Sequence, residues 1–172
     1  MRAFLLAAAV ASGTALAATT EPPAPAAADV AGNTAVDFKN PEKFVDAWTD
    51  GYGTGASDDV TRALRVHLEK LGRQYLPAGQ QLQITITDID LAGRYDMMRS
   101  RTDWIRVMRD VDWPRIDLHY RLTQDGRTLR EADARVSDMN YLSRIALQRS
   151  TEPLRYEKDM LAQWFAKTFG AS

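Results

Sequence analysis

The sequence predicts an α+β fold: a two-layer sandwich in which one antiparallel or mixed sheet of four or five strands carries two main helices on one face. Three observations lead to this prediction. Several segments alternate apolar and polar residues, two longer segments repeat apolar residues at helical spacing, and the order is strand, helix, three or four strands, helix. Each strand has one apolar and one polar face, so both helices are expected on one side, with water on the other.

Five segments have the pattern of strands: 36–38, 81–90, 104–108, 116–122 and 129–138. The alternation in the second segment breaks at Asp88, which falls on the apolar side, so a bulge is expected near Thr87–Asp88. Asp125-Gly126 predicts a tight hairpin turn between the last two strands.

Two segments have helical spacing. Ser57 is a good N-cap for the first. The apolar positions that follow recur every three or four residues: Val60, Leu64, Leu68, Leu71 and Tyr75. Residues 76–79 (LPAG) end this helix. The last helix is expected over residues 154–169, with Gly170 as its C-cap.

The first 17 residues have the layout of a secretory signal peptide. Met1 and Arg2 give a positive start, residues 3–11 are apolar, and Ala15-Leu16-Ala17 offers small residues for cleavage. Residues 18–33 read as an Ala/Pro-rich linker and 34–172 as a single domain. We therefore expect a soluble periplasmic protein with no stable membrane insertion. The chain has no cysteine, so disulfides and a lipoprotein anchor are not expected.

Charge is balanced along the chain, with 22 basic and 23 acidic residues. A nucleic-acid-binding protein normally carries a basic excess, so no nucleic-acid partner is expected. Ten arginines fall between Arg94 and Arg135, together with eight acidic residues. This mixture is typical of a salt-bridged surface.

Four carboxylates are the candidates for chemistry: Asp88, Asp90, Asp138 and Glu157. The first two share one side of a strand, the third ends another strand, and Glu157 lies on the apolar stripe of the last helix. Converging carboxylates could hold a hard cation such as Ca²⁺ or Mg²⁺, and two of them could form a catalytic acid/base pair. The third interpretation, a structural network with arginine and tyrosine, is the one the sequence favours.

Other motifs predict neither a cofactor nor a metal. Residues 51–56 (GYGTGA) match one form of the dinucleotide fingerprint, but Asp58 and Asp59 at the following helix start would repel a pyrophosphate. His67 and His119 are the only histidines, and neither has a second histidine at metal-ligand spacing.

Three motifs occur in order: residues 87–93 (TDIDLAG), residues 138–142 (DMNYL), and Tyr156-Glu157-Lys158-x-Met160-Leu161-x-x-Trp164. Together they resemble an uncharacterised family of exported proteobacterial proteins, the domain of unknown function 3016, over about residues 34–169. The resemblance implies an envelope location and no reaction, and it transfers no catalytic residue.

Two hypotheses for function follow. The first is a non-enzymatic cell-envelope protein that binds a protein or envelope ligand through the polar sheet face or the loops 88–95 and 138–153, with Trp113 as a possible anchor. The second is a carboxylate-dependent enzyme or divalent-cation-binding module. It would use Asp88, Asp90 and Asp138, with Glu157 as an additional candidate. The sequence favours no particular oligomeric state.

Overall fold

The computed structural model describes residues 33–49, 55–95 and 106–170. The predicted signal peptide and all but the last residue of the predicted linker lie outside the described residues. So do the first four residues of the glycine motif at 51–56 and the first two of the strand expected at 104–108.

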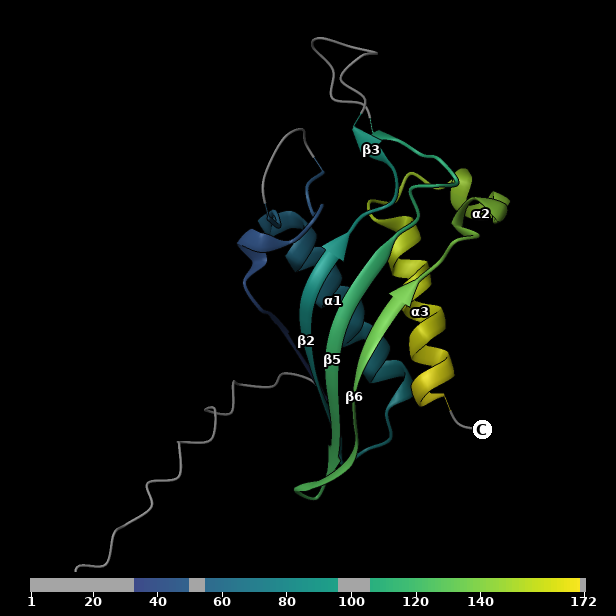
Figure 1. Ribbon diagram of the computed structural model, residues 1–172. Helices are drawn as coiled ribbons and strands as arrows, with labels where there is room; N and C mark the ends of the chain where they lie inside the picture. The colour runs from purple at the N-terminus through teal and green to yellow at the C-terminus, as the bar shows by residue number, and fades with distance from the viewer. Residues whose placement is uncertain (1–32, 50–54, 96–105, 171–172) are drawn as a thin grey trace, which may run out of the picture.

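A four-stranded mixed sheet forms one layer of the structure, as the sequence predicts (Figure 1). Its strands are β1 (Thr34–Phe38), β2 (Gln80–Asp90), β5 (Arg115–Gln124) and β6 (Arg127–Ser137), in the spatial order β1-β2-β5-β6. β1 pairs with β2 in parallel, and the other two pairings are antiparallel. The short β1 therefore lies at one edge of the sheet and β6 at the other.

Two helices, α1 (Asp58–Tyr75) and α3 (Arg155–Phe169), form the second layer and cover one face of the sheet (Figure 1). The side chain of Ser57 accepts a hydrogen bond from the Val60 backbone amide, which confirms the expected N-cap. The connection from β6 to α3 contains a 3-10 turn (Tyr141–Ser143) and a short helix α2 (Ile145–Gln148). Another 3-10 turn, Pro41–Lys43, follows β1.

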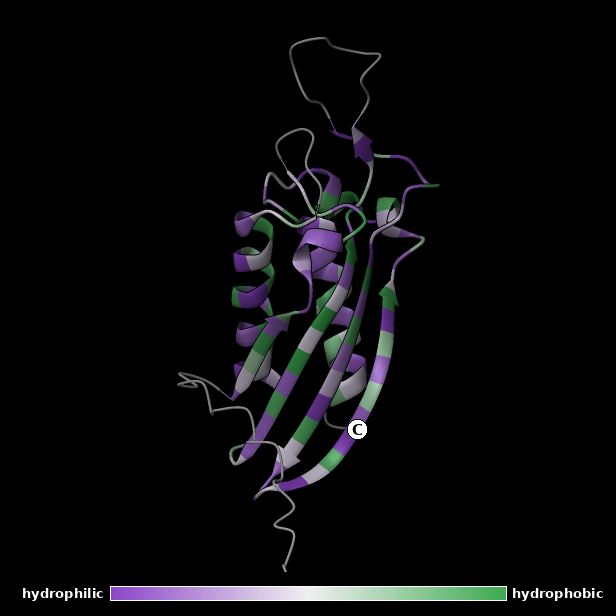
Figure 2. Cartoon of the chain, turned by 60° about the vertical axis from the view of Figure 1, so that its left-hand side comes forward, coloured by the Kyte–Doolittle hydropathy of each residue, from purple (hydrophilic) through white to green (hydrophobic). Residues whose placement is uncertain are grey.

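The core lies between the sheet and these two helices. The strands alternate green and purple along their length in Figure 2, as expected for a sheet with one buried face. The apolar stripe of α1 is fully buried at Val60, Leu64 and Leu68. Phe165 of α3 is also fully buried. Its ring packs against the ring of Tyr75, with 5.8 Å between the two ring centroids. Burial of this apolar face is the main stabilising term of such a fold.

A bulge interrupts β2 at the place where the sequence predicts one. Ile86 pairs with Leu118, but the next registered pair is Asp88 with Asp117, so Thr87 is the extra residue. Beyond it the faces exchange. Even-numbered β2 residues face the core before the bulge, and Ile89, paired with the buried Ile116, faces the core after it.

A second, two-stranded sheet lies above the main one, formed by β3 (Arg94–Tyr95) and β4 (Arg106–Val107). The described part of the segment expected as a strand at 104–108 thus pairs with β3. It does not add a fifth strand to the main sheet. Gly93, at φ 75°, turns the chain away from the main sheet. Its backbone lies so close to Val107 that an added Cβ would come within 2.5 Å of the Val107 carbonyl oxygen.

Two glycines offer a matched test of backbone packing. Gly93 and Gly126 share a φ of 75°, but a Cβ at Gly126, in the predicted hairpin turn, would meet nothing within 4 Å. We expect G126A to lower the free energy of unfolding by about 1–2 kcal/mol, the cost of a left-handed conformation. G93A should cost clearly more, because it adds a clash to the same backbone cost. Urea denaturation of both variants measures this, and equal losses would contradict the close contact.

Candidate functional site

The four predicted carboxylates all belong to the upper end of the sheet in Figure 1. β2 and β6 end there, and β5 and α3 begin there. Their shared position follows from the topology, because an antiparallel sheet brings the end of one strand beside the start of the next. Each carboxylate has its own partners.

Asp88 fixes the bulge. Its Oδ1 accepts a hydrogen bond from the Val45 backbone amide at 2.9 Å and another from the Ile89 amide at 3.0 Å. The first bond ties the segment after β1 to β2, and the second stabilises the irregular backbone of the bulge itself. Asp88 therefore serves as a backbone acceptor.

Asp90 is buried and lies between two arginines. Arg94 Nη2 is 2.8 Å from Oδ1, and Arg115 Nη2 is 3.3 Å from Oδ2. Burial raises the pKa of Asp90 above its ordinary value, against the opposing effect of Arg94 and Arg115. The two guanidinium groups compensate part of the cost of removing this carboxylate from water.

Asp138 caps the turn after β6. Its Oδ1 accepts a hydrogen bond from the Asn140 amide at 3.0 Å, and its Oδ2 pairs with Arg144. Arg144 also lies 2.9 Å from Asp159 of α3, so the turn is joined to the helix layer.

Glu157 is the most buried of the four, with 3% of its surface exposed. Its Oε1 accepts a hydrogen bond from the Ala92 backbone amide at 2.8 Å. Burial raises the pKa of Glu157 above its ordinary value, although Arg106 and Arg155 lie near enough to oppose the change. A carboxyl group whose pKa is displaced in this way is a feature common at functional sites.

The structure does not bring the four acids to one point. Within the described residues, no group of three or more histidine, aspartate or glutamate side chains is arranged to hold a metal ion. His67 lies at the edge of the core, where Nε2 is 2.8 Å from the Lys158 carbonyl oxygen. Trp113, the candidate anchor, is 37% exposed.

Asp46 and Arg106 are central to this region, although neither lies in a motif of the sequence. The two side chains pair through both carboxylate oxygens, at 2.7 Å from Nη2 to Oδ1 and 3.1 Å from Nη1 to Oδ2. Arg94 reaches Asp46 as well, at 3.2 Å, and so links it to Asp90. Only the excess of arginine between residues 94 and 135 hinted at such a network in the sequence.

Arg106 holds three separate segments together. Its Nη1 donates to the carbonyl oxygens of Ala92 and Gly93, and its Nη2 donates to that of Trp48. The guanidinium group also lies 4.7 Å from the centre of the Tyr95 ring. A planar group with five donors can make all these contacts at once, which lysine could not.

A pocket of about 90 Å³ opens beside this network, between the turn after β2 and the start of α3. Its lining residues are Thr49, Leu91, Ala92, Arg106, Met108, Leu154, Arg155, Tyr156 and Glu157. Glu157 is thus the one predicted acid that reaches the pocket; the other three do not line it.

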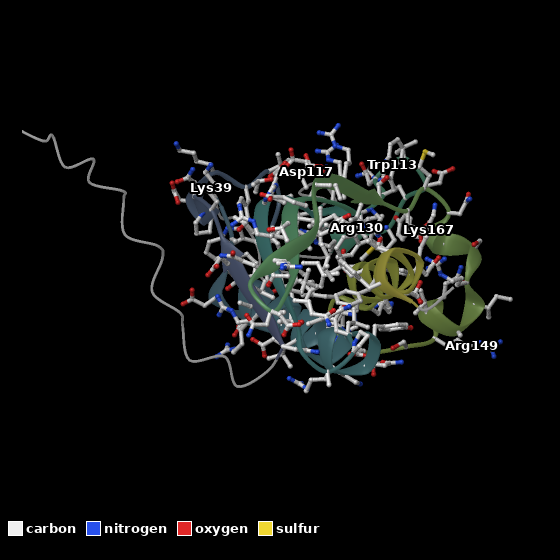
Figure 3. The ribbon with its side chains drawn as sticks, turned by 90° about the horizontal axis from the view of Figure 1, so that it is seen from below. Lys39, Trp113, Asp117, Arg130, Arg149 and Lys167 are labelled. Atoms are coloured by element: carbon white, nitrogen blue, oxygen red, sulfur yellow. The ribbon has the colours of Figure 1, made fainter. Side chains whose placement is uncertain are left out.

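The uncovered face of the sheet carries cross-strand ion pairs between β5 and β6. They are Arg135–Asp117, Arg121–Glu131, and His119 with both Glu131 and Asp133. Figure 3 shows Asp117 on the side of the sheet away from α1. A hydrogen bond with Asp133 raises the pKa of His119 above its ordinary value. Because these groups are exposed, each pair contributes little to stability.

The chain belongs to a family of proteins of unknown function, DUF3016, whose model matches residues 32–167. This match confirms the resemblance noted in the sequence. Searches among curated proteins and among solved structures find no match. Within the described residues, no helix combines the length and apolar character needed to cross a membrane.

Replacement of Asp88 tests its structural role. We expect D88A to lower the free energy of unfolding by about 1–3 kcal/mol, because the amides of Val45 and Ile89 lose their acceptor. D88N is the matched control, since it keeps an oxygen at the same position and should lose less. Thermal and urea denaturation measure both, and an unchanged midpoint for D88A would refute the role.

The raised pKa of Glu157 makes a prediction with a definite sign. A carboxyl group whose pKa is higher in the folded state stabilises below its unfolded pKa, and that contribution is lost as the pH rises through the folded pKa. E157Q keeps an oxygen for the Ala92 amide and removes the titration. We therefore expect the stability of E157Q relative to the wild type to increase as the pH rises above about 4.5.

The control for this measurement is E152Q. The exposed Glu152 has its pKa lowered by a hydrogen bond from Lys158, so its contribution has the opposite pH dependence. Stability of the three proteins is measured by urea denaturation at several pH values. Parallel profiles for the wild type and E157Q would show that Glu157 titrates in the folded protein as it does in the unfolded chain.

Proposed function

We propose that this protein is a non-catalytic binding protein of the bacterial cell envelope. In this proposal residues 1–17 direct export and are removed, and the domain works in the periplasm. Its ligand, a protein or another envelope component, binds at the upper end of the sheet, around the pocket beside Ala92 and Glu157. In this proposal the loops 88–95 and 138–153 surround the ligand at that end of the sheet.

The pocket is the observation that carries the proposal. Backbone amides or arginines bind the other three acids, Asp88, Asp90 and Asp138. These acids therefore serve to hold the loops around the pocket, which we call the frame. The pocket beside them is lined by polar and apolar side chains together, the composition usual for ligand sites. A frame held by buried ion pairs keeps such a pocket in one shape before a ligand arrives, and this lowers the cost of binding.

A second candidate function is favoured by Glu157 alone. A buried carboxyl group with a raised pKa that lines a pocket is what a general acid requires. This supports the alternative of a carboxylate-dependent enzyme or a divalent-cation-binding module. Asp88, Asp90 and Asp138 have a smaller part in this alternative, because the structure directs them to other partners.

Photo-crosslinking in living cells tests the first candidate. A benzophenone amino acid replaces Thr49, which is exposed and lies on the rim of the pocket, or Asp125, at the tip of the hairpin at the opposite end of the sheet. We expect irradiation to give a discrete adduct of the exported protein from position 49 and not from position 125. No adduct from either position, or equal adducts from both, would contradict the proposal.

Metal titration separates the two candidates. A binding protein of the proposed kind should show no change of melting temperature with Ca²⁺, Mg²⁺ or Mn²⁺. An increase of several degrees that is lost in E157Q would favour the second candidate, because a ligand that binds the folded state raises its stability.

A further inference from the structure

The pocket beside α3 is lined by charged and apolar side chains. The charged ones are Arg155, Glu157 and Arg106, and Arg106 is already paired with Asp46. The rest of the lining is mainly apolar: Leu91, Ala92, Met108, Leu154 and the ring of Tyr156. A ligand that fits this lining has an apolar part and a negative group.

Arg155 differs from the other arginines of this region. Arg94, Arg106 and Arg115 each lie within ion-pair distance of an aspartate. Among the described residues, Arg155 has no carboxylate at that distance; its guanidinium group lies 4.6 Å from the centre of the Tyr156 ring. Its Nε is buried and has no hydrogen-bond partner there, and the same is true of the Nε of Arg106. Arg155 therefore lines the pocket without a carboxylate paired to it in the described part of the chain.

Glu157 does not cancel this positive charge. It is almost completely buried, and its Oε1 is engaged by the Ala92 amide. Burial raises its pKa, so the neutral form is favoured relative to an ordinary glutamate. A cationic ligand would meet the guanidinium group of Arg155, which no carboxylate of the described residues pairs with, whereas Arg106 is already paired with Asp46.

The start of α3 adds to the same effect. Leu154, the residue before the helix, has a left-handed backbone (φ 55°) and gives no side-chain hydrogen bond to the first turn. The positive end of the 15-residue helix therefore faces the pocket region without a capping side chain.

We propose that the pocket binds a carboxylate group attached to a small apolar side chain. This inference rests on the proposed function, because it names the ligand class for the same pocket. A planar carboxylate can pair with a guanidinium group through two oxygens. The volume of about 90 Å³ limits the ligand to a small group, since drug-sized molecules need roughly 300–1,000 Å³.

Two sources share this chemistry: a free small acid and the carboxyl terminus of a polypeptide. N-acetyl-L-leucine represents the first, and a hexapeptide ending in leucine represents the second. N-acetyl-L-leucinamide has the same apolar side chain but no charge, and it is the control ligand. Inorganic phosphate tests whether any anion suffices.

Isothermal titration calorimetry of the purified protein measures binding of each probe. We expect saturable binding of N-acetyl-L-leucine, at least about tenfold weaker binding of its amide, and weaker binding of phosphate. R155Q should weaken binding of the acid by about tenfold or more, as expected for loss of one charge-assisted hydrogen bond. R155K, which keeps the charge without the planar fork, should be intermediate.

R149Q is the matched charge control. Arg149 is exposed, and Figure 3 shows it at the periphery of the molecule beside α2, so this variant should bind as the wild type does. Melting temperatures of all variants establish that they are folded, and R155K serves if R155Q is not. Tighter binding of the hexapeptide than of N-acetyl-L-leucine would identify a polypeptide end as the ligand within the same class.

Three results would overturn the inference: no saturable binding of either acid, equal binding of acid and amide, or wild-type affinity in R155Q. Crosslinking from position 49 distinguishes this failure from failure of the proposed function. If the adduct forms but neither acid binds, the ligand class is wrong and the binding function stands. If the adduct is also missing, the proposed function fails as well.

Discussion

The single extra residue in β2 is the constraint on which the upper end of this structure depends. Without the bulge at Thr87, the alternation of the strand would direct Asp88 and Asp90 into the layer beneath the helices. An unpaired carboxylate there would cost several kcal/mol. With the bulge, both acids leave the core face, and Ile89 takes its place opposite Ile116. The bulge also gives Asp88 its role, because the Ile89 amide in the irregular backbone donates a hydrogen bond to the Asp88 carboxylate.

Acids that are partly buried at this end of the sheet need cations to compensate their charge, and arginines provide it. Asp46 and Asp90 share Arg94, and Arg106 engages Asp46 with both terminal nitrogens. These side chains are mostly removed from water, so each pair is more costly to break than an exposed one. Arg106 also donates to backbone carbonyls of two loops. The network therefore holds in place the segments around the pocket, which contain Trp48 and Gly93. Packing of the apolar core would not fix their positions by itself.

The fold was predictable because its signals are local. The stripe on α1, the alternation in β5 and the Asp125-Gly126 turn are each visible within a few residues. The bulge was predictable for the same reason. The site was not, because Asp46 and Arg106 are 60 residues apart and neither lies in a motif. The segment at 104–108 shows the same limit: its pattern indicates a strand, but the close approach of Gly93 to Val107 selects the strand with which it pairs.

At this end of the molecule, arginines that are paired with an aspartate stabilise the structure around the pocket. An arginine without such a pair is free to bind a ligand. A guanidinium group that faces a carboxylate, as in Arg94 or Arg115, has its desolvation compensated and gains little from a further anion. Arg155 has no carboxylate at ion-pair distance among the described residues, and its guanidinium group lies over the face of the Tyr156 ring. An arginine of this kind has the most to gain when an anion arrives. Placed on the wall of a pocket beside Glu157, which is buried and bound to the Ala92 amide, it sets the sign of charge that the pocket can accept.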